Sequence, residues 1–281
     1  MPPIQWYPGH MAKTRRMLET QLRRVDAVIE LCDARAPLAS RNPVLDRMLS
    51  GKPRVLVLNK ADLADPSATQ KWLSHFKAQG IEVCAFDAMH GKGREVIALL
   101  EKAVAPAVER MRLRGAVKTA RAMIVGIPNV GKSSFVNRCL KRNAVEVGDR
   151  PGVTRAEKWL KLTPTLEMMD SPGMLWPRLD DQEAARMLCW LGSLPDDIQD
   201  IEDLAETLLR RLMEICPQQV MERFHLEKIE EEDEMQSYLE EACRGRGWLL
   251  SGGRLNTERG ARLVLDEYRA GKMGRITLET E

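Results

Sequence analysis

The sequence predicts an α/β domain with a mostly parallel sheet, followed by a domain made only of helices. Short apolar, β-rich segments alternate with helical patterns over the first two thirds of the chain, as is typical of a parallel sheet covered by helices. A glycine-rich loop at 126–133 lies between a predicted strand and a predicted helix. After about residue 177 the strand pattern stops, and Leu, Met and Ile recur at helical spacing.

The individual elements follow from local patterns. Five or six strands are predicted from apolar, often β-branched runs at 27–33, 54–59, 82–86, 122–126, 158–162 and 166–170. Helices with apolar residues at helical spacing fill most gaps, at 11–24, 43–50, 68–79, 94–114 and 132–140. The clearest helices of the second domain are at 197–213, 235–244 and 257–270, with a glycine-rich loop at 245–253.

Length and composition fit this organisation. The chain has 281 residues, 44% hydrophobic and 30% charged, which suits about two globular domains. We expect residues 1–177 to form the first and residues 178–281 the second. No signal-peptide pattern and no apolar run of about 18 residues occurs, so we expect a cytoplasmic protein without a membrane-spanning segment. Six scattered cysteines without a CxxC pair predict reduced thiols.

The charge is unevenly distributed along the chain. The formal net charge is +2, but residues 1–24 and 105–121 each carry +4, residues 244–275 carry +5, and residues 196–234 carry −10. Basic segments of this kind suit contact with nucleic acid and also occur on solvated helix faces. Charge alone leaves both interpretations open.

The strongest motif is GIPNVGKS at 126–133, which fits GxxxxGK[ST] between a strand and a helix. Its glycines let backbone N–H groups wrap phosphates, and the helix start favours negative charge. Lys132 is expected to contact the outer phosphates, and the Ser133 hydroxyl to ligate Mg²⁺. The nucleotide-binding residues predicted here are Asn129, Val130, Gly131, Lys132, Ser133 and Ser134.

Asn59, Lys60 and Asp62 form an NKxD motif at the end of a predicted strand. The Asp62 carboxylate can accept two hydrogen bonds from the N1 and 2-amino groups of guanine, and adenine has no such donor pair. NKxD alone is also compatible with an ordinary polar turn. Beside a phosphate loop it favours GTP over ATP.

The sequence DSPG at 170–173 follows another predicted strand. Asp170 can hold Mg²⁺ through water, and the Gly173 N–H can meet the γ-phosphate. Thr154 lies in the interval where a switch threonine reaches Mg²⁺. Ordinary GTPases place NKxD last, whereas here it comes first. The same sheet is kept if the chain is cut after the DxxG strand and the old termini are joined, which predicts a circularly permuted P-loop GTPase domain.

The sequence resembles the circularly permuted GTPases of the YlqF type, also called ribosome biogenesis GTPase A. The resemblance includes these motifs and the segments WYPGHM at 6–11, DARAP at 33–37 and RAGKMGRIT at 269–277. It implies GTP hydrolysis coupled to late assembly of the large ribosomal subunit, with GTP or GDP and Mg²⁺ bound. It also implies a precursor particle and its rRNA as partners, touched by the helical domain. Off the ribosome we expect a monomer.

Two positions depart from common GTPase patterns. The guanine-side loop usually reads Ser-Ala-Lys and here reads Asp87-Ala88-Met89, although the Ala88 N–H can still donate to the guanine oxygen. Met174 follows DxxG, where many GTPases have a water-orienting Gln, and a thioether cannot orient water.

His10 is the candidate catalytic residue. Helix 11–24 precedes the strand at 27–33, so it is expected to take the place of the helix that normally follows DxxG, with His10 at its start near the γ-phosphate. We hypothesise that His10 orients or polarises the attacking water, a role that the family is thought to give the matching His. The alternative is a helix-entry residue without chemistry.

Further expectations concern a cation, rRNA and the function class. Asn129 matches an Asn that helps to hold K⁺ in related K⁺-stimulated GTPases, and its alternative is a loop-shaping role. Candidates for rRNA phosphate contacts crowd the end of the chain: Arg244, Arg246, Arg254, Arg259, Arg262, Arg269, Lys272 and Arg275. The alternative function is an RNA-binding scaffold that holds GTP as a structural ligand with little turnover. A role in tRNA modification or membrane traffic is disfavoured, because no cysteine-bearing modification motif or lipidation signal occurs.

Overall fold

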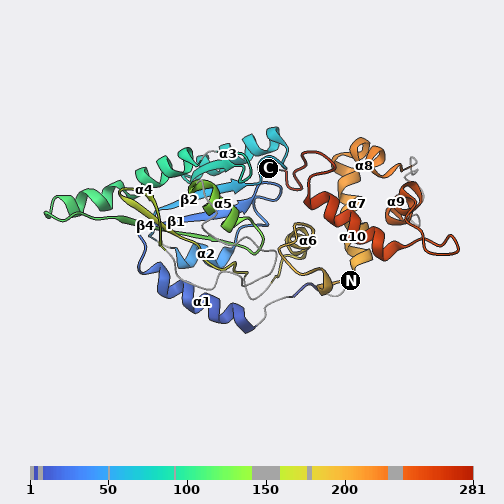
Figure 1. Ribbon diagram of the computed structural model, residues 1–281, viewed down its shortest axis with the longest axis horizontal. Coiled ribbons are helices and arrows are strands. Elements are labelled where there is room, and N and C mark those ends of the chain that lie inside the picture. Colours follow the sequence, from blue (N-terminus) through green and yellow to red (C-terminus); the bar gives the residue numbers. More distant parts are fainter. Residues whose placement is uncertain are drawn as a thin grey trace. The chain divides into compact units, whose positions relative to one another are not determined.

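The computed structural model describes residues 3–5, 9–49, 51–91, 93–140, 159–175, 179–226 and 237–280, with the backbone alone at His10. These residues form two compact units, one within Trp6–Arg178 and one of Leu179–Thr280 together with residues 3–5 (Figure 1). The sequence-based boundary after residue 177 did not anticipate that the N-terminal segment joins the helical unit. The Ile4 N–H donates to Gln182 Oε1 at 2.6 Å.

The first unit contains a six-stranded sheet of order β3-β2-β1-β4-β6-β5 (Figure 1). Its strands are β1 Ala27–Asp33, β2 Arg54–Asn59, β3 Glu82–Phe86, β4 Ala120–Gly126, β5 Trp159–Thr163 and β6 Leu166–Met169. Neighbouring strands pair in parallel except β5 and β6, which are antiparallel. The predicted α/β class is confirmed. Strand β4 begins two residues before the predicted start, because the Ala120 N–H donates to Thr165 O and extends the pairing with β6.

Helices cover both faces of this sheet. They are α1 Gly9–Leu22, α2 Pro43–Met48, α3 Pro66–Ala78, α4 Arg94–Arg112 and α5 Lys132–Leu140. Leu18 and Leu22 of α1 pack on Met123 and Val125 of β4 on one face. On the other face, the Phe135 ring of α5 meets the Phe86 ring edge-on at 4.8 Å.

Capping and proline residues move some helix ends from their predicted positions. Helix α3 begins at Pro66 and not at 68, because the Asp65 carboxylate accepts the Ala68 N–H and Pro66 occupies the first turn. Helix α1 covers Gly9–Leu22 in place of the predicted 11–24. In α2 and α4 the predicted ends ran two residues too far.

The second unit is helical, as the sequence predicts. Its elements are α6 Gln182–Trp190, a 3-10 turn Asp196–Ile198, α7 Ile201–Ile215, α8 Pro217–Phe224, α9 Tyr238–Arg246 and α10 Thr257–Arg269. Helices α6 and α8 were not among those predicted. Helix α7 starts four residues later than predicted, because Asp200 caps the N–H groups of Glu202 and Asp203.

All six cysteines are unpaired with one another in the structure and lie buried or half-buried. Among the described helices, none combines the length and the apolar content needed to cross a bilayer.

Candidate nucleotide site

The glycine-rich loop connects the carboxyl end of β4 to α5, and two of its glycines are required by their surroundings. A Cβ on Gly126 would lie 2.7 Å from Leu31 O. At Gly131, where φ is +97°, a Cβ would lie 2.5 Å from Asn59 Nδ2. Ser133 and Ser134 follow in the first turn of α5. The loop therefore sits at the carboxyl edge of the sheet, where parallel α/β folds bind ligands.

The NKxD motif holds the glycine-rich loop directly. Asn59 Nδ2 donates to Val130 O at 2.8 Å, and Lys60 Nζ donates to Asn129 O at 3.0 Å. Lys60 and Asn129 both adopt left-handed backbone conformations, with φ of 59° and 56°. The structure thus brings together four predicted site residues that lie about 70 positions apart in the chain.

A buried ion-pair network behind Lys60 was missed by sequence reasoning. The Arg35 guanidinium donates to both Asp33 carboxylate oxygens at 2.9 Å, and Lys60 Nζ lies 3.1 Å from Asp33 Oδ2. Asp33 and Arg35 are each 1% exposed. Burial alone would raise the pKa of Asp33, but Arg35 and Lys60 outweigh burial and hold that pKa well below its usual range. Asp33 and Arg35 lie in the DARAP segment, which the family resemblance marked without assigning a role.

The guanine side of the site joins the ends of β2 and β3. The Ala61 N–H donates to Phe86 O at 3.1 Å, which places Asp62 next to the loop that contains Ala88. The half-buried Asp62 carboxylate accepts no hydrogen bond from any residue that the structure describes. Asp87 shapes the neighbouring loop, since its Oδ1 accepts from the N–H groups of Met89 and His90 at 2.7 and 3.0 Å. The serine expected at this position is therefore replaced by a carboxylate that can still organise the turn.

Lys132 is a buried ammonium group whose hydrogen-bond acceptors, among the residues that the structure describes, are carbonyl oxygens of the loop itself. Its Nζ donates to Ile127 O at 2.7 Å and to Gly126 O at 3.3 Å, and the side chain is 7% exposed. Burial lowers the pKa of Lys132 to about 8. A phosphate anion at this position would remove that penalty.

Ser133 and Asp170 form the part of the site that suits a divalent cation. Ser133 Oγ donates to Asp170 Oδ2 at 3.0 Å. The second oxygen, Asp170 Oδ1, is buried without a hydrogen-bond partner among the described residues. Burial raises the pKa of Asp170, and neither Lys132 nor the Ser133 hydrogen bond cancels the increase. A hydroxyl beside a carboxylate with a free oxygen fits Mg²⁺, which binds to oxygen ligands.

Gly173 closes the phosphate side of the site. A Cβ there would lie 2.7 Å from the backbone of Pro128 and 3.1 Å from Lys132 Nζ. The DxxG segment is therefore in direct contact with the glycine-rich loop, and only glycine fits. This contact supports the predicted meeting of Gly173 with the terminal phosphate.

Met174 points into the core and away from water. It is 2% exposed and packs in the same cluster as Leu18 and Leu22 of α1. Its carbonyl accepts from Asn42 Nδ2 at 2.8 Å. Helix α1 thus packs beside the DxxG segment, and His10 lies in its first turn. The side chain of His10, Thr154 and the link at 176–178 lie outside the described residues.

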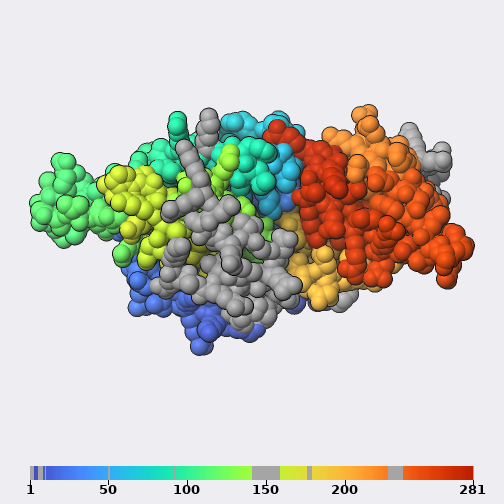
Figure 2. Space-filling model, viewed as in Figure 1, coloured from blue at the N-terminus to red at the C-terminus, as the bar shows by residue number. Residues whose placement is uncertain are grey.

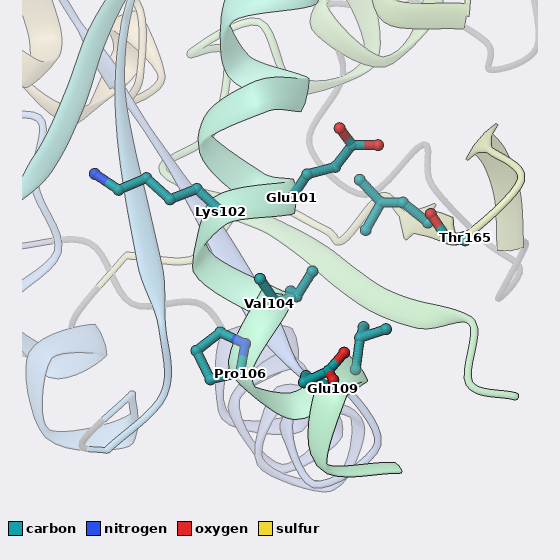
Figure 3. A pocket seen from close by; sticks show the side chains of 9 residues that line it. Glu101, Lys102, Val104, Pro106, Glu109 and Thr165 are labelled. Atoms are coloured by element: carbon teal, nitrogen blue, oxygen red, sulfur yellow. The ribbon is translucent and has the colours of Figure 1, made fainter. Parts of the chain in front are cut away.

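A separate pocket of about 590 Å³ lies between α4 and the turn before β6 (Figure 3). None of the predicted nucleotide-binding residues lines it. In Figure 3, Lys102 extends away from the pocket, and its ammonium group pairs with Glu82. Glu101 and Glu109 remain in the lining, so this pocket is unsuited to phosphate.

The fold and this site define a P-loop GTPase in which the NKxD strand β2 precedes the phosphate-loop strand β4. A family model described as "50S ribosome-binding GTPase" matches residues 121–242. The chain is 42% identical over 279 residues to ribosome biogenesis GTPase A of Bacillus cereus, covering 99% of this chain and 94% of the relative. The corresponding protein of Thermotoga maritima is 34% identical, with 98% and 94% covered.

Solved structures agree with the sequence comparison. The structure titled as GNP-bound YlqF from T. maritima aligns with a TM-score of 0.67 at 29% identity, covering 95% of this chain and 98% of that one. The GDP-bound structure of the T. maritima protein gives 0.68 at 28% identity, with 94% and 99% covered. The chain belongs to the ribosome biogenesis GTPase A family of circularly permuted GTPases.

Proposed function

We propose that this protein is a GTP-hydrolysing switch in late assembly of the large ribosomal subunit, acting in the cytoplasm on precursor particles and their rRNA. The observation that carries the GTP part is the contact of Asn59 and Lys60 with the carbonyls of Val130 and Asn129, which couples base recognition to phosphate binding. The ribosomal part is supported by the names of the relatives and by the family description.

In this proposal each site residue has a defined task. Asp62 and the Ala88 N–H bind guanine. The loop from Asn129 to Ser134 wraps the phosphates, and Lys132 and the Gly173 N–H meet the outer ones. Ser133, Asp170 and Thr154 hold Mg²⁺ directly or through water, and the metal neutralises developing charge on the phosphates.

The attacking water needs a partner other than Met174, whose side chain is buried in the core. We assign this task to His10, which lies in the first turn of the helix packed beside DxxG. Replacing His10 with Ala should lower turnover while GTP affinity stays near that of the wild type. Equal losses in both would reject a catalytic role.

Asn129 is the proposed protein ligand for K⁺ near the phosphates. Its left-handed conformation and its carbonyl contact with Lys60 fix the loop beside the phosphate site. A turnover rate that is the same in K⁺ and Na⁺ buffers would remove this assignment.

In the helical unit, we propose that only some of the basic residues contact rRNA. Arg254 and Arg259 are exposed and form no ion pair with any described residue. In contrast, Arg244 pairs with Glu240, and Arg262 pairs with Glu258. We therefore assign the phosphate contacts of this unit to Arg254 and Arg259 first.

Steady-state GTP hydrolysis in K⁺ buffer tests the proposal, with large subunits, with small subunits and with neither. Strong stimulation by the large subunit alone is the expected result. Equal and slow turnover in all three would instead favour a scaffold that holds GTP as a structural ligand, the alternative that the buried Met174 supports.

A further inference from the structure

The topology gathers basic side chains at the amino edge of the sheet, opposite the nucleotide. The end of α1, the start of β1 and the connection from α4 to β4 meet there. The Asp26 N–H donates to Arg121 O at 2.7 Å, and the Arg121 N–H donates back to Asp26 Oδ2 at 3.0 Å. Lys52 Nζ donates to Val25 O at 2.7 Å, which adds the segment before β2.

We call residues 23–26, 52, 109–121 and 167 the amino-edge surface. It contains eight basic and three acidic side chains, a net charge of +5. The acidic residues are Asp26, Glu109 and Glu167 and the basic ones are Arg23, Arg24, Lys52, Arg110, Arg112, Arg114, Lys118 and Arg121. Each acidic side chain already pairs with one basic side chain of the surface. None of these three ion pairs involves Arg110 or Arg114.

The centre of this surface extends beyond the sheet. Helix α4 has 19 residues and β4 has seven, so the helix is about 28 Å long and the strand about 23 Å. Figure 2 shows the green segment around the end of α4 extending past the neighbouring strands and helices. Leu113 is 78% exposed and Val117 is fully exposed, so no described part of the chain covers this segment.

Three exposed arginines lie at this end, and Arg112 pairs with Glu109, which leaves Arg110 and Arg114. Arg110 lies in the last turn of α4, and Arg114 lies in the turn two residues beyond the helix end at Arg112. Neither makes an ion pair or a side-chain hydrogen bond with a described residue. An ion-paired arginine loses that pairing when it binds a new anion, whereas Arg110 and Arg114 lose none.

We infer that the amino-edge surface binds the phosphate backbone of RNA, through Arg110 and Arg114 above all. Its charge is complementary to a polyanion, and the contact is separate from the nucleotide because it lies at the opposite edge of the sheet. No row of aromatic side chains lies among its residues, so stacking on unpaired bases is not the mode of binding. Folded RNA, recognised by shape and backbone, fits this chemistry. This inference rests on the proposed function in one respect, namely that the RNA is ribosomal.

The test compares two double variants of the full chain, Arg110→Gln with Arg114→Gln and Lys71→Gln with Lys77→Gln. The second pair removes the same charge from exposed positions on α3, away from the surface. Affinity is measured against salt concentration for purified large subunits and for an RNA duplex of arbitrary sequence. Affinity for a fluorescent GTP analogue reports whether the nucleotide site is intact.

We expect the arginine variant to lose affinity for both RNA ligands at low salt and to lower the log–log salt slope by about 1–2, while the lysine variant changes neither. Unchanged affinity and slope in the arginine variant would overturn the inference. Loss of subunit binding without loss of duplex binding would overturn it too, because a ribosomal protein would then be the partner. Wild type that binds duplex but not subunits, with the slope loss present, would overturn the proposed function and leave this inference standing.

Discussion

The two edges of the central sheet use charge in opposite ways. At the carboxyl edge, Asp33, Arg35 and Lys132 are buried, and each finds its partner inside the chain. At the amino edge, Arg110 and Arg114 are exposed and pair with nothing that the structure describes. The first arrangement holds its charged groups in place through contacts within the chain, whereas the second leaves charge available for a large partner.

In the C-terminal basic segment, some basic side chains are paired within the chain and others are exposed without an ion pair to a described residue. Judged by the number of basic residues alone, residues 244–275 are the strongest candidate for nucleic-acid binding, with a net charge of +5. Arg269, however, binds within its own unit to Asp196 and to the carbonyls of Cys189 and Trp190. A count of basic residues therefore overstates the charge available to RNA.

The largest effect is expected at the buried network of the carboxyl edge. Asp33→Asn leaves the Arg35 guanidinium buried without its anion, and Lys60 loses the same partner. Breaking a buried pair in this way costs about 3–5 kcal/mol. We expect the free energy of unfolding to fall by that amount in chemical denaturation, and GTP affinity to fall because Lys60 no longer holds Asn129 O.

Asp46→Asn is the matched control. Its carboxylate also faces two arginines, Arg41 and Arg54, but it is 50% exposed. Exposed pairs contribute about 0–1 kcal/mol, so this variant should stay near wild type. Similar losses in the two variants would contradict the view that burial sets the difference.

Lys132→Met should separate binding from stability. Lost contact with the outer phosphates should weaken GTP binding by roughly 100-fold or more. The protein without nucleotide should become more stable by about 1–3 kcal/mol, because burial lowers the pKa of Lys132 to about 8 and its charge is costly there. Calorimetric titration and denaturant melts measure the two quantities. A variant less stable than wild type would show that Lys132 is well compensated without a ligand.

Arg269→Gln tests whether the C-terminal segment contains structural charge. Losing the paired contacts to Asp196 and those to two carbonyls should lower the free energy of unfolding by about 2 kcal/mol. Arg262→Gln removes an exposed pair on the same helix, with Arg262 58% exposed, and should cost under about 0.5 kcal/mol. If Arg262→Gln proves the more damaging of the two, this division of the segment is wrong.

Motifs and strands were readable from sequence because their signals are local. The glycine-rich loop, NKxD and the apolar strand runs each occupy consecutive residues, so Asn59, Lys60 and Gly131 could be identified without contacts. The network of Asp33 and Arg35 could not be assigned a role, since a strand-end Asp and an Arg two residues later do not reveal from sequence that both groups are buried. Burial of Met174 likewise depends on α1, which is distant in sequence. Short helices such as α8 were not predicted, because Pro217 interrupts an otherwise continuous helical pattern.

The smallest expected effect is a change of GTP affinity with pH. It arises from Lys132 at the carboxyl edge of the sheet and not from the amino edge. The pKa of Lys132 is about 8 without nucleotide, and bound phosphates should raise it because they favour the charged form. GTP affinity should then be constant below pH 8 and fall by about tenfold between pH 8 and 9 at most, as the free protein loses its proton. The Lys132→Arg variant keeps its positive charge over this pH range. Its GTP affinity should therefore change with pH only as far as the guanine base of GTP itself titrates. Calorimetry in buffers of different ionisation enthalpy should also detect proton uptake on binding at pH 9. No uptake, together with parallel pH profiles for wild type and Lys132→Arg, would show that Lys132 stays charged before GTP arrives.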